Sequence, residues 1–198
     1  MKNIVYPLKL KFKIGTLAND FVIIDANNFT VGYVRQKMFK FVDEIQVFSD
    51  STKKNIFYTI KANKWIDFSA AYIFTDENGE QIGRVARKGW ASVWNARYNI
   101  YDKEGNQLFY IKERNPWVKV CDAILNSIPI ISLFAGYLFN PKYDVKDMQD
   151  NKIVMLKKDP SFWGRNFSVS KEGDLKDEHE EKIVLSLMMM ILLERRRG

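Results

Sequence analysis

Residues 183–193 read Ile-Val-Leu-Ser-Leu-Met-Met-Met-Ile-Leu-Leu, and this stretch decides the fold. Leucine and methionine are good helix formers. Three glutamates, Glu178, Glu180 and Glu181, precede the stretch, and the arginines 195–197 follow it. Negative charge at the start and positive charge at the end suit the dipole of a helix. The sequence therefore predicts a helix over about 178–195.

The apolar residues of this helix surround its axis, so all of its faces have to be buried, in protein or in lipid. About 11 apolar residues at roughly 1.5 Å each span about 17 Å, whereas the hydrocarbon of a bilayer is about 30 Å thick. A membrane tail anchor remains an alternative, but it is too short. A helix enclosed by protein fits, and a β-barrel wide enough to surround one helix is the natural host.

Strand patterns precede the helix. Residues 8–14, Leu-Lys-Leu-Lys-Phe-Lys-Ile, alternate apolar side chains with lysines. Such alternation predicts a half-buried strand with a solvated lysine face. Residues 21–24 form a short apolar run that stops at the turn residues 25–28, Asp-Ala-Asn-Asn. The aromatic content of 14% also favours strands.

Residues 25–65 and 76–117 are two copies of one pattern. Matching residues lie about 51 positions apart in the first half and about 52 in the second. The matches include Asp25 and Asp76, Gly32 and Gly83, Val34 and Val85, Phe57-Tyr58 and Phe109-Tyr110, and Trp65 and Trp117. Repeats of this length are typical of supersecondary units that stack or close into a ring. Short strands between Asp, Asn and Gly turns indicate an all-β sandwich or barrel.

The repeats define the predicted organisation of one domain over residues 1–198. The units cover about 21–70 and 71–118, and a degenerate third unit covers about 141–175. An apolar insertion at about 118–140 separates the second unit from the third. Within it, segment 123–139 is interrupted by Asn126, Pro129 and Gly136. We expect it to contact a membrane or a protein partner, a second copy of the chain included, through Ile128, Ile130, Ile131, Leu133 and Phe134. The alternative is that it packs as a cap on the barrel.

Composition argues against most enzymes. The chain has one cysteine and one histidine, which excludes an internal disulfide and a Cys/His zinc site. A nucleophilic dyad would need Cys121 with His179, and no local motif supports it. His179 stands among acidic residues at a helix start, where a structural role is expected. No glycine-rich phosphate loop is present. We therefore expect neither catalysis nor a cofactor nor a bound metal.

The net charge of +7 favours solubility or an anionic partner, either lipid headgroups or nucleic acid. Nucleic acid is the weaker of the two partners because the basic residues are scattered over many strands. No apolar signal peptide follows Met1, and a single cysteine suits a reducing compartment. The expected location is the cytoplasm, with peripheral attachment to a membrane.

Two stretches carry a family resemblance: residues 34–41, Val-Arg-Gln-Lys-Met-Phe-Lys-Phe, and residues 83–90, Gly-Arg-Val-Ala-Arg-Lys-Gly-Trp. The turns at 76–79 and 101–105 and the final helix support it. With them the sequence resembles the LURP-one-related branch of the tubby C-terminal-like superfamily, which also includes the phospholipid scramblases. The resemblance implies a mainly β protein, a closed antiparallel barrel of about twelve strands around a central C-terminal helix.

The resemblance also implies a function. Tubby domains bind phosphoinositides through basic strand residues, and scramblases are membrane-associated. It therefore implies a non-enzymatic barrel that binds anionic lipid or docks at a membrane surface. The alternative is a structural or protein-interaction module without a lipid ligand. No counterpart of the scramblase calcium-binding motif is found. The basic positions that the resemblance points to are Arg35, Lys37, Lys40, Arg84, Arg87 and Lys88.

Overall fold

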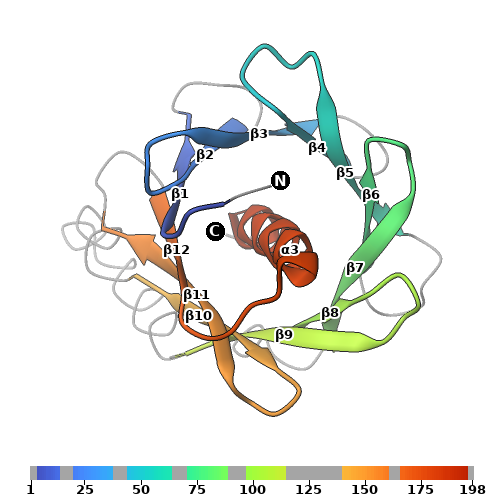
Figure 1. The fold of residues 1–198 in the computed structure, drawn as a ribbon, viewed down its shortest axis with the longest axis vertical. Helices are drawn as coiled ribbons and strands as arrows, with labels where there is room; N and C mark the ends of the chain where they lie inside the picture. Colours follow the sequence, from blue (N-terminus) through green and yellow to red (C-terminus); the bar gives the residue numbers. More distant parts are fainter. Residues whose placement is uncertain are drawn as a thin grey trace, which may run out of the picture.

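The computed structural model describes residues 4–13, 20–37, 44–63, 71–88, 97–114, 140–160 and 166–195. In these residues the chain forms twelve β-strands and the C-terminal helix α3 (Asp177–Arg195), as Figure 1 shows. The strands are β1 (Leu8–Phe12), β2 (Asp20–Ile24), β3 (Thr30–Lys37), β4 (Glu44–Phe48), β5 (Ile56–Asn63), β6 (Ala71–Asp76), β7 (Gln81–Lys88), β8 (Arg97–Tyr101), β9 (Gln107–Glu113), β10 (Lys142–Asp147), β11 (Lys152–Asp159) and β12 (Asn166–Lys171).

The strands close into one antiparallel barrel. Each pairs with its neighbours in chain order, and β1 closes the ring against β12, with Leu8 opposite Val169. Closure leaves no free sheet edge. The predicted fold, a mainly β barrel of about twelve strands, is confirmed. The strand predicted at 8–14 corresponds to β1, which ends at Phe12 in the structure. Ile14 lies outside the described residues.

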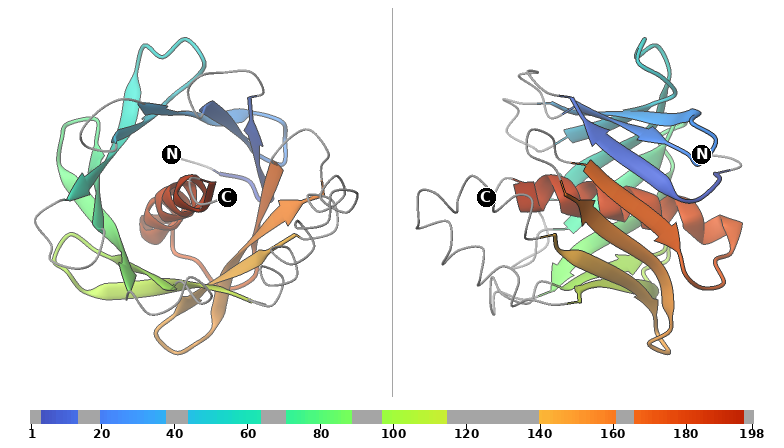
Figure 2. Two further views of the ribbon diagram at one scale, coloured as in Figure 1. Left: turned by 180° about the vertical axis from the view of Figure 1, so that it is seen from behind. Right: turned by 90° about the vertical axis from the view of Figure 1, so that its left-hand side faces the viewer.

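Helix α3 runs through the middle of the barrel (Figure 2). Its side chains from Ile183 to Leu192 are all buried against the inward-facing side chains of the strands. Ser186 is the polar exception, and its hydroxyl donates a hydrogen bond to the Lys182 carbonyl at 2.6 Å. The enclosed helix predicted from residues 183–193 is therefore confirmed. Among the described residues, no helix has the length and apolar character needed to cross a membrane.

The two ends of the barrel differ. At the end that we call the hairpin end, short turns connect β2 to β3, β4 to β5, β6 to β7, β8 to β9 and β10 to β11, and helix α3 begins there. His179, in the first turn of the helix, packs edge-to-face on Phe109 at the start of β9, with 5.4 Å between ring centroids. At the opposite end, which we call the far end, β3, β5, β7, β9 and β11 finish and helix α3 ends. The insertion predicted at about 118–140 lies outside the described residues except for Asn140.

The turns of the hairpin end share one chemistry. Each begins with an aspartate whose carbonyl accepts the N–H of the residue three positions later; the five pairs are Asp25 and Asn28, Asp50 and Lys53, Asp76 and Gly79, Asp102 and Gly105, and Asp147 and Asp150. The second residue of every pair has a positive φ. An aspartate, a turn and a left-handed residue form a hairpin that ends in a β-bulge. Asp25 and Asp76, which the repeat aligns, each bind two backbone N–H groups through Oδ1.

We expect these turns to make the fold sensitive to acid. Hydrogen bonds from Asn151 hold the pKa of Asp147 below its ordinary value of 3.8, and those from Thr52 lower the pKa of Asp50. A carboxylate with a lowered pKa stabilises the folded state fully above pH 3.8, and this stabilisation is lost as the pH falls through the folded-state pKa. Urea unfolding at about pH 5 and about pH 3 measures the loss.

Asn151→Ala removes the largest cause of the Asp147 shift, so the fall in unfolding free energy between the two pH values should shrink in this variant. Glu104→Gln is the control, because Glu104 is exposed and starts no turn. An Asn151→Ala protein with the same pH dependence as the wild type would contradict the assignment.

Candidate functional site

The structure separates the basic residues predicted as one lipid-binding set. Lys40 and the apolar contact residues Ile128, Ile130, Ile131, Leu133 and Phe134 lie outside the described residues. Arg35 and Lys37 are on β3, and the remaining three are on β7, with three strands between the two groups. The structure therefore does not bring the two groups together.

The residues on β7 do not share a face. Successive side chains of a strand point to opposite faces, so Val85 and Arg87 share one face and Arg84 is on the other. Val85 lies in the core, so its face is the inner one. Arg87 is paired with Tyr98, whose side chain also lies in the core, so Arg87 is on the inward face near the far end. Arg84 is on the outer face, where its guanidinium carbon lies 4.9 Å from the centroid of the Tyr101 ring. A stretch that looks like one cationic cluster in the sequence is split by the pleat of the strand.

Arg35 lies on the outer face beside a buried carboxylate. Its Nε is 4.0 Å from Asp20 Oδ1, and Lys53 Nζ is 3.7 Å from Asp20 Oδ2. The Tyr33 hydroxyl donates a hydrogen bond to the same carboxylate at 2.5 Å. Burial, with this hydrogen bond, raises the pKa of Tyr33 to about 12. Arg35 and Lys53 therefore both lie near the Asp20 carboxylate, which offsets part of their positive charge.

A more ordered cationic group lies on the outer face of β8 and β9. The Arg97 guanidinium carbon stacks 3.7 Å from the centroid of the Tyr110 ring. Arg97 Nε donates a hydrogen bond to Asn99 Oδ1 at 3.2 Å, and Asn99 Nδ2 donates to the Tyr101 hydroxyl at 3.3 Å. Tyr110 and Asn99 are both buried although they face outward. The group therefore forms a fixed platform of polar and aromatic side chains under Arg97.

Cross-strand register places further cations next to Arg97. Lys88 on β7 and Lys112 on β9 are its direct partners on the two sides. Like charges at directly opposed positions destabilise a sheet. In the described part of the chain neither Arg97 nor Lys112 forms an ion pair. Asp144, the carboxylate opposite Lys112, is bound by Arg114 at 2.6 Å. A second like-charged pair, Lys142 and Lys157, joins β10 and β11.

Sequence reasoning missed this outer surface. Strand alternation places Arg97, Asn99 and Tyr101 on one face of β8, and that signal was present in the sequence. The pairing of Arg97 with Lys112 and the stacking on Tyr110 depend on the register between β8 and β9, which no local pattern encodes.

Charge is distributed unequally between the two ends of the barrel. The described basic residues of the far end are Lys13, Arg35, Lys37, Lys61, Arg87, Lys88, Arg97, Lys112, Arg114, Lys142, Lys157 and Lys158, and the acidic ones are Asp20, Glu44, Glu113, Asp144 and Asp159. At the hairpin end the described acidic residues are Asp25, Asp50, Asp76, Glu77, Glu80, Asp102, Glu104, Asp147, Asp150, Glu172, Asp174, Asp177, Glu178, Glu180 and Glu181, and the basic ones are Lys9, Lys53, Lys54, Arg84, Lys103, Lys146, Lys152, Lys171, Lys176 and Lys182, with Lys11 between the two ends. By position along the strands, the far end therefore has more basic than acidic residues, and the hairpin end has more acidic than basic ones. Long side chains on the wall join the two sets of described residues in three ion pairs, Arg114 with Glu172, Lys152 with Asp144 and Lys53 with Asp20.

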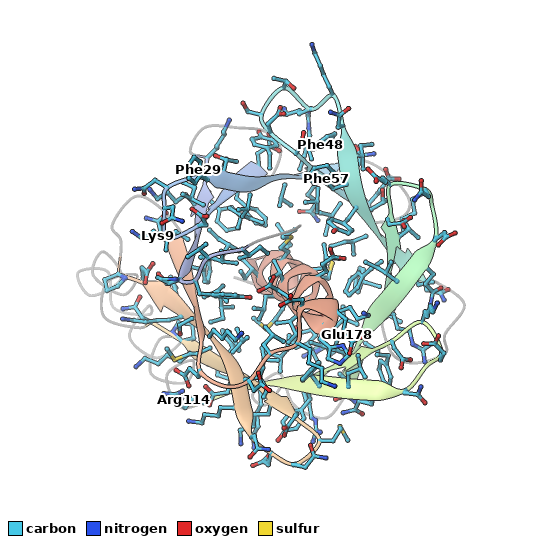
Figure 3. All side chains as sticks on the ribbon, viewed as in Figure 1. Lys9, Phe29, Phe48, Phe57, Arg114 and Glu178 are labelled. Carbon is cyan, nitrogen blue, oxygen red and sulfur yellow. The ribbon has the colours of Figure 1, made fainter. Side chains whose placement is uncertain are left out.

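Figure 3 shows one residue of each charge: Arg114 is on the outer side of the barrel wall, and Glu178 is at the start of the central helix. Burial lowers the pKa of His179. The Nε2 atom of His179 lies 3.4 Å from Oε1 of Glu178. Its packing on Phe109 agrees with the structural role expected for it. No group of three or more His, Cys, Asp or Glu side chains that could hold a metal ion occurs among the described residues. Cys121 lies outside them.

These features define a class of protein: a closed antiparallel barrel, filled by its own C-terminal helix, that displays its charged groups on the outer wall and at the two ends. The family model of the LURP-one-related proteins matches residues 30–174, and the chain belongs to this family. The match begins at β3 and ends before α3. The resemblance is therefore confirmed, and the wider tubby-like grouping is consistent with it. No curated protein and no solved structure gives a significant match.

Proposed function

We propose that the protein is a non-enzymatic binding protein that docks on anionic membrane lipid with the far end of its barrel. The opposite charges of the two ends carry the proposal. An anionic surface attracts the far end and repels the hairpin end, so the same field that draws the protein to the surface also orients it. Each lysine or arginine near such a surface contributes about 1 kcal/mol, so several are needed for stable docking.

The insertion is compatible with this orientation. The chain between Glu113 at the end of β9 and Lys142 at the start of β10 is attached to the far end. The sequence of this connection contains the apolar segment 123–139. A basic surface with an apolar element is a usual combination for peripheral membrane attachment.

Vesicle co-sedimentation tests the docking. We expect the wild-type protein to sediment with phosphatidylcholine vesicles that contain phosphatidylserine, and not with phosphatidylcholine alone. Lys142→Gln with Lys157→Gln removes a like-charged pair from the far end and should weaken binding about tenfold or more, at about 1 kcal/mol for each charge. Added salt should weaken wild-type binding in the same way.

The matched control removes two lysines from the hairpin end. Lys54→Gln with Lys103→Gln changes the net charge equally, at two exposed positions. We expect this variant to bind anionic vesicles like the wild type. Equal loss of binding in both double variants would reject the orientation. No sedimentation of the wild type at low salt would reject lipid docking and favour the protein-interaction module.

A further inference from the structure

We infer that the outer face of β8 and β9 is a binding site for a phosphate group, in which Arg97 is the principal ligand and Lys112 supplies a second charge. The inference deepens the proposed function, and it rests on that function only for the source of the phosphate, a lipid headgroup. Inorganic phosphate or a soluble phosphate ester has the same chemistry, and the experiment below separates these sources.

Arg97 is held in one orientation from two sides. The Tyr110 ring covers one face of its guanidinium at 3.7 Å, and Asn99 accepts the Nε hydrogen at 3.2 Å. A guanidinium stacked on a ring keeps its N–H groups in the plane, pointing away from the ring. The donors on the two terminal nitrogens have no partner among the described residues. The N–H groups on these two nitrogens have the spacing needed to bind two oxygens of one phosphate.

Tyr110 is a positioning residue for Arg97. Its hydroxyl donates a hydrogen bond to Asp150 in the β10–β11 turn, and Lys146 Nζ binds the same carboxylate at 2.8 Å. Tyr110 is also buried, so its ring has little freedom to turn away from Arg97. A preorganised arginine loses less conformational entropy when a ligand binds.

Lys112 makes the site suitable for a doubly charged anion. It is the direct cross-strand partner of Arg97, it is exposed, and it forms no ion pair in the described part of the chain, because the Asp144 carboxylate opposite it on β10 is bound by Arg114. Two opposed cations destabilise the sheet until an anion lies between them. The arginine fork uses both oxygens of a carboxylate, whereas a phosphate monoester has a third oxygen and a second charge for the lysine. The geometry therefore favours a phosphate monoester over a carboxylate.

This arrangement predicts opposite effects of one substitution on folding and on binding. Lys112→Gln removes the repulsion from Arg97, and Asp144, opposite Lys112, keeps its ion pair with Arg114, so the melting temperature of this variant without phosphate should equal or exceed that of the wild type. Inorganic phosphate should raise the melting temperature of the wild type relative to chloride at equal ionic strength, because a ligand of the folded state stabilises it. The increase should be smaller in Lys112→Gln.

The decisive variant is Arg97→Lys, which keeps the charge but loses the stacking and the two-point contact. It is expected to reduce the affinity for phosphate about tenfold. Vesicles of phosphatidylcholine with phosphatidylinositol monophosphate are compared with vesicles of equal charge that contain phosphatidylserine. The wild type should prefer the first, and Arg97→Lys should lose this preference while it still binds phosphatidylserine vesicles. Tyr110→Leu, which removes the ring under Arg97, should also weaken this preference, whereas Lys103→Gln, at an exposed lysine of the hairpin end, should keep it.

The failures of the two proposals can be told apart. If the wild type binds both kinds of charged vesicle equally, or Arg97→Lys keeps the preference, the phosphate site is wrong although lipid docking stands. If inorganic phosphate raises the melting temperature through Arg97 but no vesicle is bound, the phosphate site is supported with a soluble ligand, and the membrane proposal fails. If phosphate has no effect and no vesicle is bound, both proposals fail.

Discussion

Replacing Leu185 with aspartate is expected to unfold the barrel. Leu185 is fully buried in the central helix, and apolar side chains of the helix and the wall surround it. A carboxylate placed there would lie within this apolar cluster, and an unpaired buried charge costs at least about 5 kcal/mol. A domain of this size has a total stability of about 5–15 kcal/mol. Circular dichroism and urea unfolding measure the outcome.

The control for this prediction is Leu185→Met, which conserves volume and should cost less than about 1.5 kcal/mol. Deletion of residues 183–193 should also unfold the domain, because it exposes the whole apolar inner wall to water. A deletion protein that stays soluble with an unchanged β circular-dichroism spectrum would disprove the central role of the helix. A Leu185→Asp protein with wild-type stability would also disprove it.

The second large effect is expected at Asp144, on the outer wall. Arg114 binds this carboxylate twice, through Nη2 at 2.6 Å and through Nε at 3.2 Å, and Lys152 lies 3.7 Å away. The Asp144 side chain is only 7% exposed. Asp144→Asn removes the buried half of the ion pair, and we expect it to lower the free energy of unfolding by about 2–3 kcal/mol. Burial of the pair is partial, since the Arg114 side chain is 36% exposed, which keeps the loss below that of a fully buried pair.

Arg114 also contacts a second carboxylate, that of Glu172, which can be compared with Asp144. Glu172 lies 3.9 Å from Arg114 Nη2, and its side chain is 31% exposed. A solvent-exposed pair at this distance contributes little, so Glu172→Gln should change the free energy of unfolding by less than about 0.5 kcal/mol. Urea unfolding of both variants under one set of conditions decides the point. Equal losses would mean that burial does not control the strength of these contacts.

The strand and turn pattern was open to prediction because it is local. Alternating lysines in 8–14, the aspartate turns and the all-round apolar helix each depend on neighbouring residues. The repeat added that such units recur, which limits the arrangements to stacked or closed ones. Leu8 and Leu10 are buried, and Lys9 and Lys11 are exposed, as the alternation predicts.

The candidate site was less predictable, and β7 shows why. Arg84, Arg87 and Lys88 lie close together in the sequence, but the pleat sends Arg84 outward to Tyr101 and leaves Arg87 on the inner face. Arg97 and Lys112 lie far apart in the sequence, and the β8–β9 register makes them direct partners. Sequence proximity therefore identified cations, but it did not identify which of them lie together.

By itself the sequence determined that the run 183–193 must be enclosed, because apolar side chains on all sides of a helix cannot face water and the run is too short for a bilayer. It also determined the turns at 25–28, 76–79 and 101–105, because an aspartate followed by an asparagine or glycine that adopts the left-handed conformation specifies a hairpin over a few positions. Only the tertiary structure decided which charges meet. Closing the ring fixes the register of every strand pair, and that register places Arg97 on Tyr110 and beside Lys112, and separates a positive end from a negative one.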